Sequence, residues 1–163
     1  MDTTRFTARP SVCAAVVTVM TSAGVLAAPP AAAGDQAGAV LSGINGERTA
    51  NGCAPLAPDA QLTAAAGRQA GDIQSTGVVG HAGSDGSTPA TRIADAGYAP
   101  VSAWAENAYR GSGGMATAAA AAVSWMSSPG HRANILNCAL TDVGVAAPAV
   151  GDTMTAVTVF ATH

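Results

Sequence analysis

This chain of 163 residues contains no lysine, and its seven basic residues are all arginines scattered along the sequence. Ten acidic residues outweigh them, so the formal net charge is −3 with neutral histidines. Proteins that bind nucleic acids draw most of their non-specific affinity from clustered positive charge. Because the sequence has no basic stripe, we expect no nucleic-acid partner.

Long apolar runs are scarce, and the one that approaches the length of a membrane span lies near the N-terminus. This run, Val12–Ala28, follows Arg5 and Arg9 and leads into a stretch of small residues. A basic region, an apolar region and small residues in this order are typical of a secretory signal peptide, and the run is short for a membrane span. We therefore predict a signal peptide over residues 1–33 and a single exported, extracellular domain over residues 34–163. An uncleaved N-terminal anchor is the alternative, and no membrane span is expected in the mature chain.

Cysteine is also rare, with three in the whole chain. Cys13 falls within the predicted signal peptide, which leaves Cys53 and Cys138 in the mature domain. An even number of cysteines in an oxidising compartment favours a disulfide, which in the chain-entropy model stabilises the fold by roughly 4–5 kcal/mol. Two unrelated buried thiols are the alternative.

Six aromatic residues are few for a domain of this length. The core must therefore rely on leucine, valine, isoleucine and closely packed alanine. We expect the largest core volumes to be filled by Trp104, Trp125 and Phe160.

Helical periodicity is strongest in the first half of the mature chain. The first helix is expected over Gln36–Ala50, with Val40, Leu41, Ile44 and the stem of Arg48 on one side. The second helix is expected from Pro58-Asp59 to about Thr76, with Gly77 as a left-handed stop. A third helix starts at Ser87 or Thr88, before Pro89, carries Ile93 inward and stops at Gly97.

The second half combines strand patterns with one long helix. Strands are expected over 101–110, 143–146 and 154–160, the last two forming an antiparallel hairpin. A helix spans 115–127, and Pro129 ends it and begins the next turn. Because helices and strands do not alternate, this order favours an α+β fold with an antiparallel sheet flanked by helices.

Two histidines and one carboxylate stand out as candidate site residues. His81 precedes a Gly-Ser-Asp-Gly-Ser turn, Glu106 lies in the strand pattern, and His131 begins a short helix within Ser-Pro-Gly-His-Arg-Ala-Asn-Ile-Leu. Imidazoles and a carboxylate suit Zn²⁺, with a fourth position open to water or a ligand. Each histidine has a structural alternative as a hydrogen-bonded residue, and Glu106 has one as an ion-pair partner of Arg132.

These motifs, together with Asn-x-x-Arg at Asn45–Arg48 and Thr-Asp-Val-Gly-Val at 141–145, resemble the CAP superfamily of cysteine-rich secretory, antigen 5 and pathogenesis-related proteins. The resemblance implies an α-β-α sandwich with a central antiparallel sheet and a cleft lined by His81, Glu106 and His131. Many relatives carry a second glutamate where this chain has Ser128. Asp85 is a possible substitute, although a turn aspartate more often caps its own backbone.

The function expected from these features is an extracellular ligand-binding or interaction module with a polar histidine and glutamate cleft, with a divalent metal as a possible occupant. The resemblance implies a small molecule or a lipid as the ligand. The alternative is a metal-assisted hydrolase of peptides or envelope polymers in which Glu106 acts on zinc-bound water. The sequence contains no His-Glu-x-x-His motif, and a second glutamate is missing, so binding is the preferred expectation. A structural module with a vestigial cleft is the third possibility.

Overall fold

The computed structural model describes Met1 and residues 33–163, so nearly all of the predicted signal peptide lies outside the described residues. Helices and strands follow one another in this order: α1 (Ala33–Ala50), β1 (Ala57–Pro58), α2 (Ala60–Thr76), α3 (Pro89–Asp95), β2 (Ala103–Ser112), the 3₁₀ turn η1 (Gly113–Met115), α4 (Ala118–Ser127), α5 (Pro129–Ile135), β3 (Asp142–Ala146), β4 (Ala149–Val150) and β5 (Thr153–Thr162). Within these residues, no helix combines the length and the hydropathy needed to cross a bilayer.

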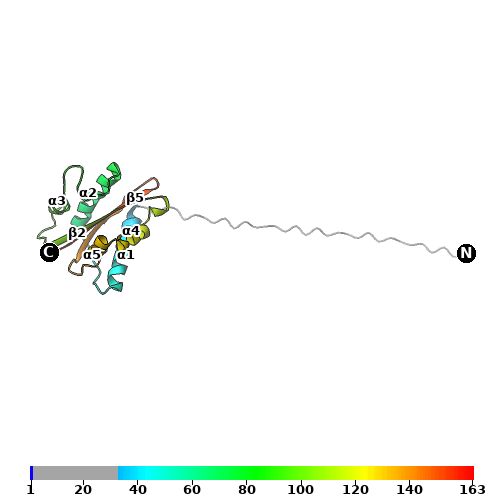
Figure 1. Ribbon diagram of the computed structural model, residues 1–163, viewed down its shortest axis with the longest axis horizontal. Helices are drawn as coiled ribbons and strands as arrows, with labels where there is room; N and C mark the ends of the chain where they lie inside the picture. Colours follow the sequence, from blue (N-terminus) through cyan, green and yellow to red (C-terminus); the bar gives the residue numbers. More distant parts are fainter. Residues whose placement is uncertain (2–32) are drawn as a thin grey trace.

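The strands form one sheet in the order β1-β3-β5-β2, with β4 beside the start of β5. Helices α2 and α3 cover one face of the sheet, whereas α1, α4 and α5 cover the other (Figure 1). This arrangement confirms the predicted α-β-α sandwich. All pairs are antiparallel except β1 with β3, a two-residue parallel pair that lies where the chain crosses from α1 on one face to α2 on the other.

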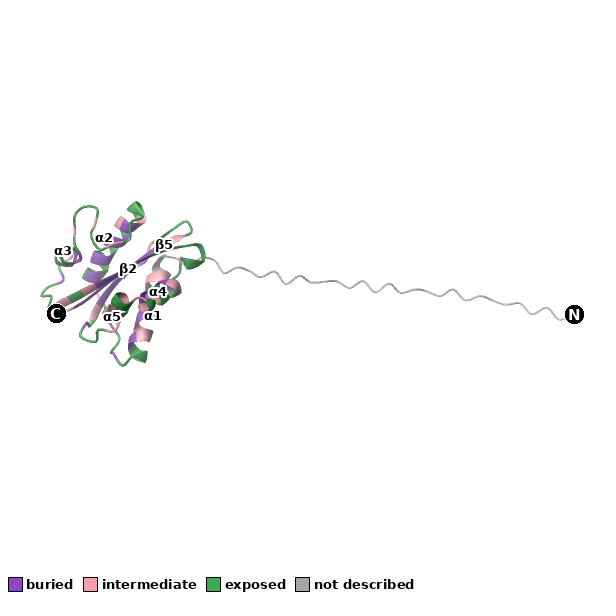
Figure 2. Ribbon diagram, viewed as in Figure 1, coloured by how far each residue is buried: buried purple, intermediate pink, exposed green. Residues whose placement is uncertain are grey.

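Each face of the sheet has its own apolar core, seen as purple between the layers in Figure 2. Side chains alternate along β5, so Phe160 packs toward α1, α4 and α5, while Val157 and Val159 pack toward α2 and α3. Both faces of β5 are therefore buried, which fits a sequence that carries apolar residues on both sides of the strand and buries Thr155 and Thr158 as well.

The prediction that Trp104 fills the core is wrong. Trp125 and Phe160 are fully buried, but Trp104 is 45% exposed. Trp104 lies near the start of β2, the last strand of the sheet, on the face where the seven-residue helix α3 is the nearest cover. Because α3 is so short, it leaves one side of the indole open to solvent.

Local signals set the ends of α2 as expected. Asp59 accepts a hydrogen bond from the backbone N–H of Leu62, and Gly77 ends the helix in the left-handed region with φ of 76°. Pro58 lies in β1 rather than in the first turn of α2. The helix also lies very close to the sheet, since a Cβ atom on Gly144 would fall 1.9 Å from the carbonyl carbon of Leu62.

Arg48 and a disulfide both connect the end of α1 and the loop after it to the segment 135–140 that follows α5. Cys53 and Cys138 are bonded, as expected, with their Cα atoms 5.0 Å apart. Arg48 is 1% exposed, and its guanidinium donates to four backbone carbonyls. The four acceptors are Ala54 at 2.9 Å, Ile135 at 2.8 Å, Asn137 at 3.0 Å and Leu140 at 2.9 Å.

Candidate functional site

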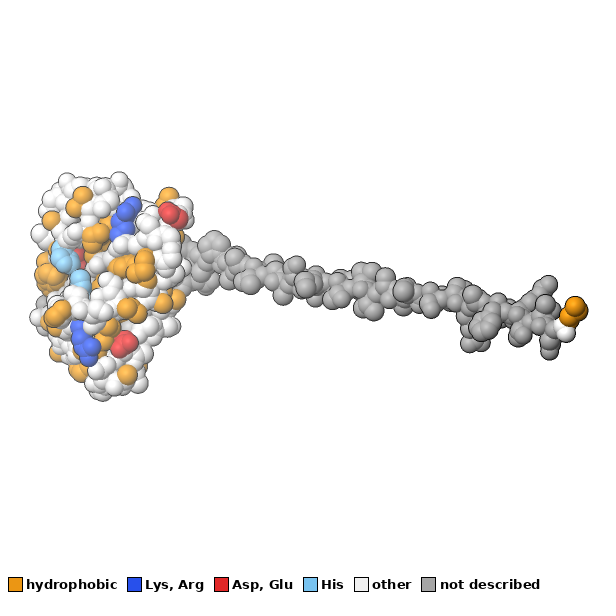
Figure 3. Space-filling view, turned by 45° about the vertical axis from the view of Figure 1, so that its right-hand side comes forward, with side chains coloured by type: hydrophobic (Ala, Val, Ile, Leu, Met, Phe, Trp, Pro, Cys, Tyr) orange, Lys and Arg blue, Asp and Glu red, His pale blue; other side chains and the backbone are white. Residues whose placement is uncertain are grey.

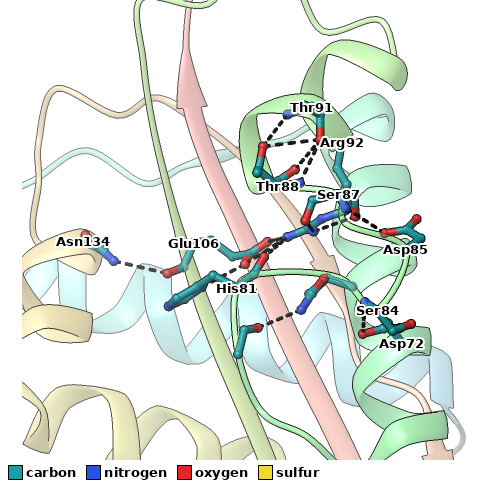
Figure 4. A network of polar contacts seen from close by, with 12 residues as sticks. Asp72, His81, Ser84, Asp85, Ser87, Thr88, Thr91, Arg92, Glu106 and Asn134 are labelled. Atoms are coloured by element: carbon teal, nitrogen blue, oxygen red, sulfur yellow. Dashed lines mark hydrogen bonds and ion pairs between the residues drawn. The ribbon is translucent and has the colours of Figure 1, made fainter.

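Glu106 is the centre of the candidate site, and it is held in a buried ion pair. Strand β2 directs its side chain toward the α3 side of the sheet, where Nη2 of Arg92 donates to Oε2 at 2.9 Å and to Oε1 at 3.2 Å (Figure 4). Both side chains are 1% exposed. A buried carboxylate is expensive unless it is paired, so Arg92 makes this position possible for Glu106.

His81 is hydrogen-bonded to the same carboxylate but faces solvent. Its Nδ1 lies 2.9 Å from Oε1 of Glu106, and its side chain is 55% exposed. A carboxylate acceptor at Nδ1 favours the proton on that nitrogen, so Nε2 is left available to a ligand. The other ring nitrogen points away from Glu106 in Figure 4. Arg92 also donates to the backbone carbonyl of His81 at 2.9 Å, which fixes the loop that carries the ring.

Arg92 was not among the residues singled out from the sequence. Thr88 caps α3 in a capping box with Thr91, and Pro89 begins the helix, so Arg92 leaves its first turn toward Glu106. The Nη1 atom donates to the hydroxyl of Ser87 at 3.1 Å. The predicted alternative partner Arg132 is exposed on α5, so that pairing is wrong. The sequence did contain a signal for this partner, since Arg92 lies in a short helix that directly follows the turn after His81.

His131 lies on α5, across strand β2 from His81. Its backbone carbonyl accepts a hydrogen bond from Asn107 at 3.1 Å, and Asn134, one turn later, donates to the carbonyl of Glu106 at 3.3 Å. Its Nδ1 is buried without a hydrogen-bond partner. Burial lowers the pKa of His131, and positive charge on His81 lowers it further.

The site opens into a hollow of about 290 Å³. The residues that line it are His81, Pro89, Trp104, Glu106 and Asn134. Figure 3 shows histidine side chains gathered on one face of the molecule, with acidic surface beside them. The fold thus brings His81 and Glu106 into direct contact, whereas His131 flanks the hollow through its neighbour Asn134.

Other polar residues considered from the sequence have local roles. Asp85 accepts from the backbone N–H of Ser87 at 2.8 Å and pairs with Arg68 at 3.2 Å. It lines a separate hollow of about 260 Å³ against α2, so it does not replace the missing second glutamate in the cleft. The Ser127 hydroxyl donates to the carbonyl of Val123 at 2.7 Å, and the Ser128 side chain makes no capping hydrogen bond to α5.

The family model of the cysteine-rich secretory protein family, CAP, matches residues 41–160. This chain belongs to the CAP family. A comparison with curated proteins finds no match.

Solved structures of bacterial proteins share the CAP fold of this chain. An extracellular protein with an SCP domain from Bacillus anthracis str. Ames aligns with a TM-score of 0.68 and 22% identity over 80% of this chain. An outer surface protein from Borrelia burgdorferi aligns with a TM-score of 0.70 and 19% identity over 79% of this chain and 93% of its own. A cysteine-rich secretory protein from Staphylococcus aureus subsp. aureus Mu50 aligns with a TM-score of 0.59 and 18% identity over 83% of this chain.

The lengths of these relatives differ from that of this CAP domain. The chain spans 41% of the Bacillus protein and 40% of the Staphylococcus protein. At these identities the likeness concerns the fold, and two of the three proteins are described as extracellular or outer-surface proteins.

Proposed function

We propose that this CAP domain is an exported ligand-binding module in which His81 receives a polar group of the ligand, with His131 beside it. Export through a signal peptide at residues 1–33 is part of the proposal. It is supported by the Cys53–Cys138 disulfide and by relatives described as extracellular or outer-surface proteins.

The observation that carries this proposal is the chain of contacts from Arg92 through Glu106 to His81. The buried charges of Arg92 and Glu106 neutralise one another, and the Glu106 carboxylate also contacts Nδ1 of an imidazole that is 55% exposed. A stabilising ion pair would not need an exposed imidazole at its end. Fixing the ring in advance reduces the entropy that a ligand must overcome when it binds.

The hydrolase alternative has less support from this geometry. A general base needs a lone pair that is free to take a proton from the nucleophile. Both oxygens of Glu106 accept hydrogen bonds from Arg92, and one also contacts His81. The carboxylate is therefore engaged with two side chains of the protein rather than directed toward a nucleophile.

A zinc site with three protein ligands does not fit the donors of the cleft. Among the described residues, no group of three or more histidine, cysteine, aspartate or glutamate side chains could hold a metal ion. The Glu106 oxygens and Nδ1 of His81 are already engaged with one another. The donors that remain are the second nitrogen of His81 and those of His131, so we assign the cleft to a polar ligand and derive no step through zinc.

The proposal is tested by titrating the isotopically labelled exported domain with acetate, phosphate and Zn²⁺ in turn, while NMR follows the ring signals of all three histidines and the side-chain amide signals of Asn134. We expect acetate to shift the signals of His81 and Asn134. The signals of His163, which contacts Tyr98 and Pro100, should move little and provide an internal control.

A variant of His81 completes this test. The His81→Ala variant should lose the acetate response while it keeps the melting temperature of the wild type, because the side chain is largely exposed. A wild-type domain whose His81 and Asn134 signals respond to none of the three probes would overturn the proposal. A tight zinc complex that depends on Glu106 would instead revive the metal-assisted alternative.

A further inference from the structure

The two cleft histidines are held in place by different means. His131 belongs to helix α5, so the helix sets the direction of its side chain. His81 lies in an irregular loop between α2 and α3, where no backbone–backbone hydrogen bond involves residues 78–82 of the described chain. The segment that carries the His81 ring therefore depends on side chains of the neighbouring helices.

Two buried side chains hold the peptide groups on either side of the His81 Cα atom. Nε2 of Gln69 on α2 donates to the carbonyl of Gly80 at 2.7 Å, and Nη2 of Arg92 on α3 donates to the carbonyl of His81 at 2.9 Å. Each peptide group is planar, so two successive carbonyls with fixed directions restrict the φ and ψ angles between them. The two contacts thus set the direction of the His81 side chain and its approach to Glu106.

We propose that Gln69 is a positioning residue of the cleft, which keeps Nδ1 of His81 against Glu106 and so leaves Nε2 facing the ligand. This inference rests on the proposed function, because it concerns the same imidazole. It adds a residue that does not line the hollow and that acts on the ring through the loop backbone.

The surroundings of Gln69 argue against a role in packing alone. Gln69 is the one polar side chain among the six buried residues of α2, and it is 1% exposed. Its Oε1 atom is buried and accepts no hydrogen bond from the described residues. An apolar side chain of similar length would avoid the free-energy cost of this unpaired acceptor. The amide therefore contributes its contact with Gly80 rather than a gain in core stability.

The other side of the loop is anchored farther from the ring and nearer to solvent. Asp72 accepts hydrogen bonds from the backbone N–H of Ser84 at 3.2 Å and from the Ser84 hydroxyl (Figure 4). Ser84 is exposed, and it belongs to a turn that has backbone hydrogen bonds of its own over Gly83–Ser87. We therefore expect this anchor to matter less for the direction of the His81 ring than Gln69 does.

Gln69→Met tests the assignment, because methionine fills a similar volume but cannot donate to Gly80. In the ligand-free wild type, at a pH where the ring is neutral, the ¹⁵N signals of His81 should place the proton on Nδ1, beside Glu106. In Gln69→Met these signals should move toward those of a free imidazole, in which both tautomers are populated. The affinity for acetate should fall about three- to ten-fold, because the ligand must then order the ring.

Gln69→Asn is a second variant that keeps the polarity of the position. Its amide is one methylene shorter, so it cannot reach the Gly80 carbonyl from the same place on α2. The His81 signals should change in the same direction as in Gln69→Met, and the affinity for acetate should fall as well. A folded Gln69→Asn domain with the wild-type tautomer would contradict the positioning role, even if Gln69→Met failed to fold.

Two controls separate positioning from a general loss of stability. Ile73→Val shortens a fully buried side chain of the same helix and leaves the Gly80 contact in place. It should lower the urea midpoint without changing the His81 tautomer or the affinity for acetate. Ser84→Ala removes the hydroxyl that donates to Asp72, and it should change the affinity for acetate by less than about two-fold.

The outcomes distinguish this inference from the proposed function. If both Gln69 variants keep the wild-type tautomer and affinity, the positioning role is refuted and the proposed function stands. If the tautomer changes in these variants but acetate does not shift the His81 signals of the wild type, the positioning role stands and the binding of acetate is refuted. If Ile73→Val or Ser84→Ala changes the tautomer equally, the assignment to Gln69 is refuted.

Discussion

Two buried arginines lie on opposite faces of the sheet, and their surroundings differ in kind. Arg48 on α1 donates only to backbone carbonyls, whereas Arg92 on α3 pairs with the carboxylate of Glu106. Each side chain is 1% exposed. The contacts of Arg48 all lie within the protein, while those of Arg92 continue through Glu106 to the exposed ring of His81.

This difference separates a purely structural arginine from one that supports the proposed binding cleft. The acceptors of Arg48 belong to the main chain, so no substitution can remove them together with the arginine. Arg92 also donates to the carbonyl of His81 and the hydroxyl of Ser87, but its charged acceptor, Glu106, is a side chain that a second substitution can remove. Burial alone therefore does not tell which arginine supports a site, but the chemical type of the partner does.

Substitution of Arg48 should have the largest effect on stability. Arg48→Met leaves four carbonyls without this donor in a region closed to water, and we expect the free energy of unfolding to fall by at least about 3 kcal/mol. Urea denaturation of the oxidised domain measures this loss. Arg110→Met, at an exposed position on β2, is the control and should change the same quantity by less than about 0.5 kcal/mol. A loss below about 1 kcal/mol in Arg48→Met would contradict the structural role.

Substitution of Arg92 should be partly reversible by a second change. Arg92→Met leaves a buried carboxylate without its cation and should cost about 2–3 kcal/mol, less than a carboxylate with no partner would lose, because Nδ1 of His81 still lies within hydrogen-bonding distance of Oε1. The double variant Arg92→Met/Glu106→Leu removes both charges and should regain at least half of that loss in the same urea measurement. Acetate should still cause no shift of the His81 signals in the double variant, since the ring has lost its hydrogen bond to Glu106. Equal stability of the single and double variants would show that the unpaired charge of Glu106 is not the cause of the loss in Arg92→Met.

Acid should loosen the Arg92 side of the molecule before the Arg48 side, although by the smallest margin of the three predictions. Hydrogen bonds from Ser87, and then the charge of Arg68, lower the pKa of Asp85 from 3.8 to about 2. The folded turn therefore releases this proton more readily than the unfolded chain does. Its contribution to stability is present above pH 3.8 and is lost as the pH falls toward 2.

The Asp85 prediction is checked by the difference in urea midpoint between the wild type and Asp85→Asn, which should shrink over that pH range. Asp95→Asn removes the other carboxylate partner of Arg68 without touching the Ser87 turn, and it is the matched control. A difference that grows on acidification would contradict the sign. The carbonyl partners of Arg48 do not titrate, so we expect its contribution to stability to stay constant over the same pH range.

Features with local causes could be predicted from the sequence. Asp59 and Gly77 mark the ends of α2, Thr88 and Pro89 begin α3, and the apolar runs of β3 and β5 are antiparallel neighbours. These features depend on side chains that act within a few residues of themselves. The ordered motifs around the two histidines and the glutamate also indicated the family.

Features with distant causes could not be predicted in this way. The partner of Glu106 lies 14 residues away in a different element, and sequence spacing alone did not distinguish Arg92 from Arg132. The exposure of Trp104 depends on how far the short helix α3 extends over the sheet, which hydrophobicity does not report. The pairing of β1 depends on where the chain crosses the sheet edge.

The Cys53–Cys138 disulfide has a consequence for how the domain responds to proteolysis. It joins positions 85 residues apart, and the exposed loop between α2 and α3 lies between them. A single cut in that loop would leave the two fragments joined by the disulfide, with β1 in the first fragment and the other strands of the sheet in the second. The clipped molecule would migrate as one species until a reductant released its two pieces.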